Sequence, residues 1–302
     1  MATDRPFDLV RQVRSNDVLG EGPCWHAADA RLYWFDIKGR RLCWFTPGAG
    51  DHGEWALPVI ASAAAPWGPG RLVTATDKGL GSIDTATGAL EILAPLQLPQ
   101  GVRTNDGKID VRGRFWWSSM DDHHGERPGA IFRTDPDGTT HRVLDGIHIA
   151  NTISGTSDGK QLYLADSRLG TMWTFDVDDA GVLGGRRELF NLKGEAGAPD
   201  GSALDAEGYL WNAQWGAWRI VRYAPDGAVD RIFPVPVQQP TSLAFGGPDL
   251  STLYLTSARD GLSEEALAGQ PDAGSLFAFN PGVRGLALPD FTGPTLLGPI
   301  PA

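Results

Sequence analysis

The sequence predicts an all-β fold, a six-bladed β-propeller of four-stranded antiparallel blades. The first observation is a set of bulky residues that follow short turns, most of them containing Gly, with separations of 39, 44, 47, 48 and 43 residues. These anchors are Tyr33, Leu72, Trp116, Tyr163, Trp211 and Tyr254. The second is a bulky residue leading into a Pro, Asp or Gly turn, which also occurs six times, at Phe45, Ile83, Phe132, Phe175, Tyr223 and Phe279. The third is that helical periodicity is confined to a short stretch at Ser263 to Leu267. Six units of this length, each with room for four short strands, fit a propeller better than a sandwich.

The whole chain, residues 1–302, is expected to be a single propeller domain. Its 39 glycines are spread evenly along the sequence instead of gathering in linkers. Two segments could close the ring by pairing with the last blade. One is the alternating stretch at residues 7–14, and the other is the C-terminal run at residues 286–288.

The composition restricts the partners. A formal net charge of -11 and a pI near 4.9 argue against nucleic acid or an anionic membrane surface, because those partners need clustered Lys and Arg. A small-molecule substrate is expected instead. The first twenty residues contain no apolar leader, so we expect a cytoplasmic protein in which Cys24 and Cys43 are reduced, structural thiols.

One position in each repeat is predicted to line the central channel. Around Asp200 the sequence indicates a β-hairpin, with a strand at 201–204, a turn at 205–208 and an aromatic strand after it. Counting 11 or 12 residues back from each anchor gives Glu21, Ala61, Asn105, Asn151, Asp200 and Ser242. Because these residues lie at the same distance before their anchors, they should occupy equivalent positions at the start of the innermost strand of each blade. They should therefore face one another across the axis.

Two carboxylates and two amides in a narrow, partly desolvated space are costly unless a cation satisfies them. Oxygen ligands without clustered His or Cys suit Ca²⁺, Mg²⁺ or Mn²⁺, and also admit Fe²⁺ or Zn²⁺. Three protein ligands would leave coordination positions for water and substrate. The alternative is that Asp200 and Asn151 only cap turns, as Asp and Asn often do.

Other polar and aromatic residues are predicted near this ring. Arg103 and Asn105 are two apart on an extended segment and therefore share a face, so Arg103 could grip sugar hydroxyls or an ester oxygen. Trp215 and Trp218 fit either a stacking wall or blade packing. Residues 121–124, Asp-Asp-His-His, could form a mobile rim or a solvated loop. No phosphate-binding loop occurs, which excludes a nucleotide-binding function.

Several motifs together resemble one family. They are Leu19 to Trp25 (LGEGPCW), Arg103 to Lys108 (RTNDGK), Gly113 to Trp116 (GRFW), Ser157 to Lys160 (SDGK), Pro199 to Gly201 (PDG) and Pro240 to Asp249 (PTSLAFGGPD). In this order they resemble the gluconolactonase/regucalcin (senescence marker protein) family over about residues 8–285. The resemblance implies a six-bladed propeller that hydrolyses sugar lactones with one divalent cation.

Carried over residue by residue, the resemblance implies that Glu21, Asn151 and Asp200 hold the metal. It also implies that Arg103 and Asn105 bind substrate and that Asp200 is the catalytic base. Ca²⁺ is the first expectation for the ion, with Zn²⁺, Mn²⁺, Mg²⁺ or Fe²⁺ as alternatives. The sequence departs from the family pattern in two places. Thr152 follows Asn151 where Gly is usual, and a Ser-Ser-Met run at 118–120 stands where Gly-Thr-Met is common.

The expected function is therefore that of a metal-dependent enzyme that opens a sugar lactone to its aldonic acid. One rival is a non-catalytic propeller that binds Ca²⁺ or a partner. Open coordination positions facing a pocket would distinguish the enzyme from this rival. A second rival is a related ester or phosphotriester hydrolase, which would need a larger apolar pocket.

Overall fold

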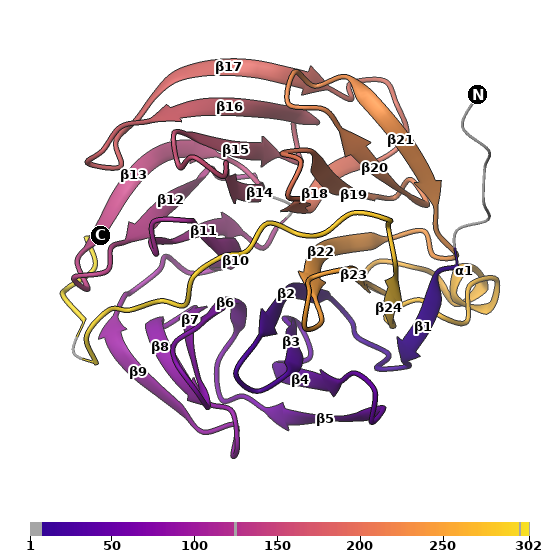
Figure 1. Ribbon diagram of the computed structural model, residues 1–302, viewed down its shortest axis with the longest axis horizontal. Coiled ribbons are helices and arrows are strands. Elements are labelled where there is room, and N and C mark those ends of the chain that lie inside the picture. Colours follow the sequence, from indigo (N-terminus) through magenta and orange to yellow (C-terminus); the bar gives the residue numbers. More distant parts are fainter. Residues whose placement is uncertain (1–7, 124–125, 296, 302) are drawn as a thin grey trace.

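Six radial sheets surround a central channel in the computed structural model, which describes residues 8–123, 126–295 and 297–301 (Figure 1). Each sheet has four antiparallel strands, and almost all of the regular structure is strand. The predicted six-bladed β-propeller is confirmed.

The strands of each blade follow one another outward from the channel. The innermost strands are β2 (Gly20–His26), β6 (Ala61–Pro66), β10 (Val102–Ile109), β14 (Ala150–Gly155), β18 (Ala198–Leu204) and β22 (Pro240–Gly246). The second strands are β3 (Arg31–Asp36), β7 (Arg71–Thr76), β11 (Phe115–Asp121), β15 (Gln161–Asp166), β19 (Leu210–Trp215) and β23 (Thr252–Ser257). The third strands are β4 (Arg41–Thr46), β8 (Gly79–Asp84), β12 (Gly129–Thr134), β16 (Thr171–Val177), β20 (Arg219–Tyr223) and β24 (Leu276–Phe279). The outermost strands are β5 (Asp51–Ala56), β9 (Leu90–Pro95), β13 (Thr140–Ile147), β17 (Leu183–Asn191), β21 (Val229–Pro234) and β1 (Val10–Val13).

The ring is closed by the N-terminal strand. Strand β1 pairs with β24, with Val10 opposite Ala278 and Val13 opposite Leu276. Of the two predicted closing segments, the N-terminal one is therefore correct, although Phe7 lies outside the described residues. The C-terminal run at 286–288 belongs to a tail that crosses one face of the propeller (Figure 1).

The repeated anchors pack between blades and are held by the turns that precede them. Trp211 is fully buried, and its ring contacts Phe245 of the neighbouring blade at a centroid distance of 6.3 Å. Its indole Nε1 donates to Asp205 in the preceding turn at 2.9 Å, and Trp116 donates to Asp110 in the same way at 2.8 Å. An Asp in the turn thus satisfies the one polar group of a buried Trp, which explains why the turn and the anchor recur together.

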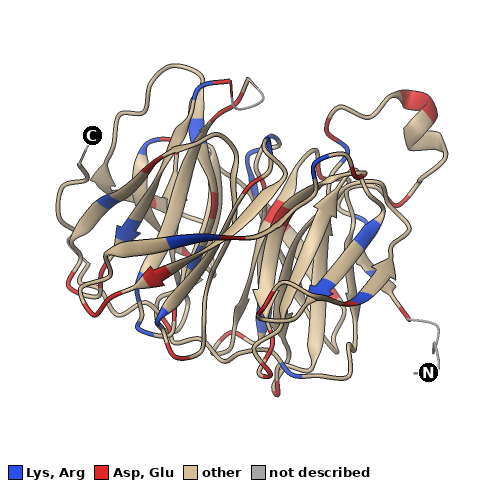
Figure 2. Ribbon diagram, turned by 90° about the horizontal axis from the view of Figure 1, so that it is seen from above, with Lys and Arg blue, Asp and Glu red and all other residues tan. Residues whose placement is uncertain are grey.

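The one described α-helix, α1 (Glu264–Ala268), lies in the connection between β23 and β24. Ser263 caps it by accepting a hydrogen bond from the backbone N–H of Ala266, at the place where the sequence predicted a short helix. The helix projects beyond the blades in the edge-on view, with its acidic first turn in red (Figure 2). No helix in the described part of the chain is long and apolar enough to cross a membrane.

Candidate active site

A polar pocket of about 300 Å³ opens at the mouth of the channel where the innermost strands begin. The pocket is lined by all five residues singled out for metal or substrate, Glu21, Arg103, Asn105, Asn151 and Asp200. They come from strands β2, β10, β14 and β18, which are spread over about 180 positions of sequence. The structure therefore brings together the residues that the repeat phase and the resemblance selected.

The other two phase positions, Ala61 and Ser242, do not line this pocket, so the predicted six-membered ring is wrong at two places. Strand pairing gives the reason. Trp211 pairs with Ala203, three residues after Asp200, whereas Tyr254 pairs with Ala244, only two residues after Ser242.

Ser242 instead packs against the neighbouring inner strand. A Cβ placed on Gly201 would lie 2.1 Å from the hydroxyl oxygen of Ser242, so that side chain sits directly over the Gly201 backbone. In the blade of Ala61 the pairing differs in the opposite direction, because Leu72 pairs with Pro66, which is five residues after Ala61 instead of three.

A β-bulge shapes the inner strand at each polar position. The pairing register shifts between Glu21 and Cys24, and again between Asn151 and Ser154. Strands β10 and β18 shift at Thr104/Gly107 and Pro199/Ser202, which brackets Asn105 and Asp200. Bulges interrupt the alternation of side chains and can redirect a residue, here toward the channel mouth.

Of the four carboxylates that line the pocket, Glu21 and Asp200 are buried and disfavour each other's charge, whereas Asp122 and Asp260 are more exposed. Burial, followed by the nearby Asp106 carboxylate, raises the pKa of Glu21 to about 8. Burial, followed by Glu21 and then Asp106, raises the pKa of Asp200 well above its usual range. Both acids would be stabilised as anions by a cation between them, so this donor set fits a divalent metal.

The amide of Asn151 completes the set of oxygens. Its Nδ2 donates to Ser167 Oγ at 2.8 Å, and that hydroxyl in turn donates to the carbonyl of Pro199 at 2.6 Å. Its Oδ1 accepts from Asn105 Nδ2 at 3.1 Å, which leaves this carbonyl oxygen a second lone pair. The candidate donors are therefore the carboxylates of Glu21 and Asp200 and the amide of Asn151. No cluster of three or more His, Cys, Asp or Glu residues suited to a metal occurs in the described ranges.

Arg103 is held in place beside this set. Its Nε donates to Asp122 at 2.6 Å, and its Nη1 donates to Asn105 Oδ1 at 2.7 Å. Asp122 also lines the pocket, whereas the adjacent Asp121 pairs with Arg127 at 2.9 Å. Sequence reasoning grouped these two acids in one rim loop and missed their separate partners. His124 of that loop lies outside the described residues.

Thr152, where the family pattern has Gly, adopts the left-handed backbone with φ of 56°. A β-branched residue rarely takes this conformation, which costs of order 1–3 kcal/mol. Its hydroxyl donates to the backbone carbonyl of Asp200 at 2.5 Å and lies 2.9 Å from Ser202 Oγ. The substitution thus keeps the glycine-like backbone and adds a link between two neighbouring inner strands.

A buried carboxylate, Asp106, and a half-buried ammonium, Lys108, lie beneath the pocket, and sequence reasoning missed both. Asp106 accepts from the backbone N–H of Ile153 at 3.0 Å, and the Lys108 ammonium donates to the carbonyls of Ser202 and, at 3.4 Å, Leu243. The segment after Asn105 therefore connects to three other inner strands and fixes backbone near Asn151 and Asp200.

The two aromatic candidates, Trp215 and Trp218, lie in different environments. Trp215 lines the polar pocket, whereas Trp218 does not and is 42% exposed. A stacking role is therefore open to Trp215 alone of these two residues.

The protein is a six-bladed propeller that carries carboxylates, amides and a guanidinium at one mouth of its channel. These groups are suited to oxygen-rich ligands and cations. The chain belongs to the SMP-30/gluconolactonase/LRE-like family, whose profile matches residues 19–259.

Among curated proteins, the chain is 35% identical to an L-arabinolactonase of Azospirillum brasilense over 284 residues, which cover 92% of this chain and 94% of that protein. It is 33% identical to a 6-deoxy-6-sulfogluconolactonase of Pseudomonas putida, with coverage of 93% and 97%. Among solved structures it resembles a calcium-binding protein, regucalcin, from Agrobacterium tumefaciens. The TM-score is 0.89 and the identity 32%, with 96% of this chain and 98% of that chain covered.

Proposed function

We propose that the protein is a metal-dependent sugar lactonase that hydrolyses an aldonolactone to the aldonic acid. The observation that carries the proposal is the convergence of Glu21 and Asp200 with Asn151, Asn105 and Arg103 in one pocket. Lactonases among its relatives, and a calcium-binding protein among its structural neighbours, support the same activity and cofactor. A cytoplasmic location is part of the proposal, supported by the two free cysteines, Cys24 and Cys43.

Glu21, Asn151 and Asp200 would hold one divalent cation, with Ca²⁺ proposed first. When bound, the ion would supply Lewis-acid polarisation of the lactone carbonyl. Arg103 and Asn105 would orient the ring through hydrogen bonds to its oxygens, since Asp122 already fixes the guanidinium.

Asp200 would accept a proton from the attacking water as the water oxygen bonds to the carbonyl carbon. The bond from that carbon to the ring oxygen then breaks, and the ring oxygen takes up a proton to become a hydroxyl group. The product is the open-chain hydroxy acid, and its atoms balance those of the lactone plus one water.

A panel of five- and six-membered aldonolactones, assayed by acid release, tests the proposal. The protein is first stripped by chelation, with its metal content checked by elemental analysis, and single metals are then added back. Spontaneous hydrolysis is subtracted at each pH. We expect turnover to fall to the uncatalysed rate without metal and to return with one or more ions.

Native turnover by fully demetallated protein would contradict the metal mechanism. Tight metal binding without turnover of any lactone would favour the rival function, a non-catalytic calcium-binding propeller.

A further inference from the structure

A second cavity, of about 460 Å³, lies at the opposite mouth of the channel. It is lined by the ends of the innermost strands, where the polar pocket is lined by their beginnings. The two pockets have no lining residue in common. The second cavity is therefore a separate site and takes no part in the proposed lactone chemistry.

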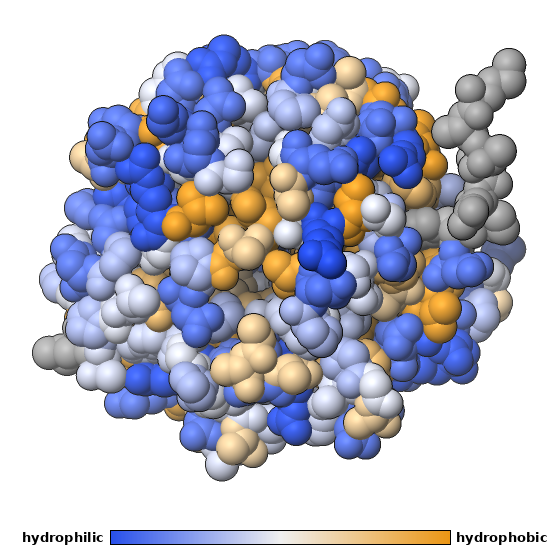
Figure 3. All heavy atoms as spheres, in the orientation of Figure 1, coloured by the Kyte–Doolittle hydropathy of each residue, from blue (hydrophilic) through white to orange (hydrophobic). Residues whose placement is uncertain are grey.

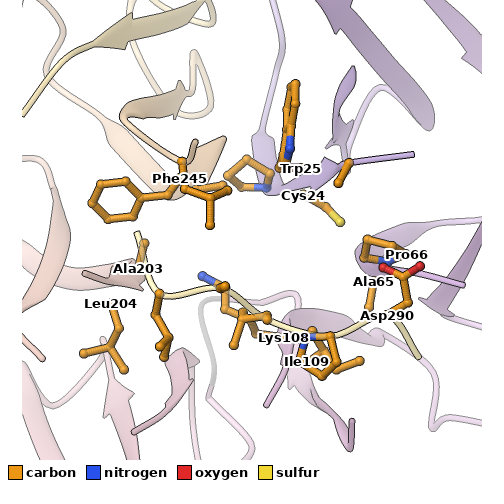
Figure 4. Close-up of a pocket in the computed structure, with 18 of the residues that line it drawn as sticks. Cys24, Trp25, Ala65, Pro66, Lys108, Ile109, Ala203, Leu204, Phe245 and Asp290 are labelled. Carbon is orange, nitrogen blue, oxygen red and sulfur yellow. The ribbon is translucent and has the colours of Figure 1, made fainter. Parts of the chain in front are cut away.

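The walls of this cavity are mostly apolar and rigidly held (Figure 4). Trp25 stacks on Tyr254 with an interplanar angle of 7°, and Phe245 packs edge-on against Trp211. The space-filling view of this face shows apolar side chains gathered near its centre (Figure 3). A preformed apolar cavity of this size is typical of small-molecule sites.

The C-terminal tail covers the mouth of the cavity as a strap. The strap is tied at one end by Leu286 N–H to the carbonyl of Leu204 at 3.0 Å, and at the other by Phe291 N–H to the carbonyl of Pro66 at 2.7 Å. Between these ties, residues 287–290 make no backbone hydrogen bond to the rest of the described backbone. Leu288, 38% exposed, lies over the cavity from this segment.

One ammonium group faces this apolar space. Lys108 is half-buried and lines the cavity, with its amino nitrogen directed between the walls (Figure 4). Its bonds to Ser202 and Leu243 use two of its three N–H groups, so one has no hydrogen-bond partner among the described residues. A ligand acceptor could take that third N–H.

The charges around the cavity disfavour an ionic ligand. The buried carboxylate of Asp106 interacts with Lys108 and offsets its positive charge, and Asp290 adds a carboxylate at the strap. Cys24, which also points into the cavity, stays a neutral thiol because burial raises its pKa to about 12. A cation would meet the ammonium, and an anion would meet the Asp290 carboxylate while Asp106 offsets the charge of the ammonium.

We propose that this cavity binds a small, uncharged, mostly apolar molecule with one hydrogen-bond acceptor, of the ketone or ester class. The acceptor would face Lys108, and the apolar chain would lie against Trp25, Phe245 and Leu288.

The test uses full-length protein and three probes of equal chain length, 2-decanone, decanoate and decylammonium, each below its critical micelle concentration. Ligand-observed NMR titrations measure their affinities. We expect saturable binding of 2-decanone and binding of both charged probes that is weaker by about fivefold or more. Leu288→Trp should fill the cavity and weaken 2-decanone binding at least about tenfold. Val229→Trp, at an exposed site 55% accessible and outside the cavity, is the matched control and should leave binding unchanged.

Non-saturable binding of 2-decanone, or equal binding to the Leu288→Trp variant, would overturn the site. Tighter binding of either charged probe would overturn the assignment of ligand class. Intermolecular nuclear Overhauser contacts between the ketone chain and the Trp25 ring in the wild-type protein locate the ligand without any variant. Their absence at saturation would also overturn the proposal. Lactone turnover of the folded Leu288→Trp protein should be unchanged, which separates this result from the fate of the proposed lactonase function.

Discussion

Strands β2, β10, β14 and β18 line the pockets at both mouths of the channel, yet the two mouths differ in chemistry. Where the strands begin, bulges direct carboxylates, amides and a guanidinium into a pocket. Where the strands end, small and apolar residues line a larger cavity beneath the C-terminal strap. A single inner strand, β10, contributes Asn105 to the first and Lys108 to the second.

The difference teaches that a propeller can place different chemistry at the two ends of its axis. Each inner strand needs only a change of residue type along its length to serve both mouths, because the blades supply the same scaffold to both. Asp106 lies buried between the two pockets, and the half-buried Lys108, with which it interacts, lines the second cavity. Changes at one mouth should therefore leave the other mouth intact, whereas changes at these two residues should affect stability as a whole.

The largest effect is expected from Asp200→Asn. The amide keeps an oxygen for the cation but cannot accept a proton from water near neutral pH, so lactone turnover should fall by about 10²- to 10⁴-fold. The measurement is kcat with metal occupancy confirmed directly. Binding of 2-decanone at the other mouth should not change.

Asn151→Asp is the matched control, since it also keeps the oxygen and should lose less turnover. Near-native kcat in metal-loaded Asp200→Asn would remove Asp200 from the role of base.

Arg103→Ala should act on substrate and not on the ion. Loss of a charged hydrogen-bond donor is typically equivalent to about a 10- to 100-fold fall in kcat/KM. Metal affinity, measured by titration of stripped protein, should stay close to that of the wild type. Arg127→Ala removes a guanidinium that pairs with Asp121 outside the pocket and serves as the control. If Arg103→Ala loses the metal instead, the roles at this mouth are misassigned.

Lys108→Met tests the region between the pockets. It leaves the carbonyls of Ser202 and Leu243 without their charged donor, and a buried acceptor without a partner costs about 1–3 kcal/mol. The free energy of unfolding in denaturant should fall by that amount. Lys78→Met, which breaks only a surface pair with Asp77, should cost less than about 1 kcal/mol. An equal loss of stability in the two variants would mean that the hydrogen bonds of Lys108 stabilise the fold no more than a surface ion pair does.

The smallest effect is expected at Thr152. Thr152→Ala removes the hydroxyl bonds to Asp200 and Ser202 but keeps the strained backbone, whereas Thr152→Gly removes both the bonds and the strain. Glycine should therefore be more stable than alanine here by about 1 kcal/mol. Paired denaturant titrations measure the difference. Greater stability of the alanine variant would show that the left-handed backbone at this position is not strained.

The sequence predicts the fold well because the propeller is built from local signals. A short turn followed by a buried anchor recurs in each repeat, and hydrogen bonds such as that from Trp211 to Asp205 form within one hairpin. The polar pocket could also be predicted from the sequence. Four of its residues lie 11 or 12 positions before the anchor of their repeat, and Arg103 shares a face with Asn105.

The errors arise where structure depends on register or on other blades. Ser242 has the same spacing to its anchor as Glu21, but its hairpin pairs one residue differently, and side-chain types do not reveal that shift. Lys108 and Asp106 bind the backbone of other inner strands, so these contacts form only once the ring has closed. The apolar cavity depends in the same way on a tail that crosses to distant blades.

The closure of the ring also bears on how the chain is made. Strand β1 at Val10–Val13 has its partner in β24 at Leu276–Phe279, so a strand that leaves the ribosome early pairs with one that leaves it much later. At typical synthesis rates of about 5–20 residues per second, the N-terminal strand waits roughly 15–50 s for that partner. During this time the other five blades can form, whereas the sixth blade cannot be completed. A nascent chain that stalls before residue 276 would carry an unpaired strand at each end of an open ring, and such edges favour pairing with other chains.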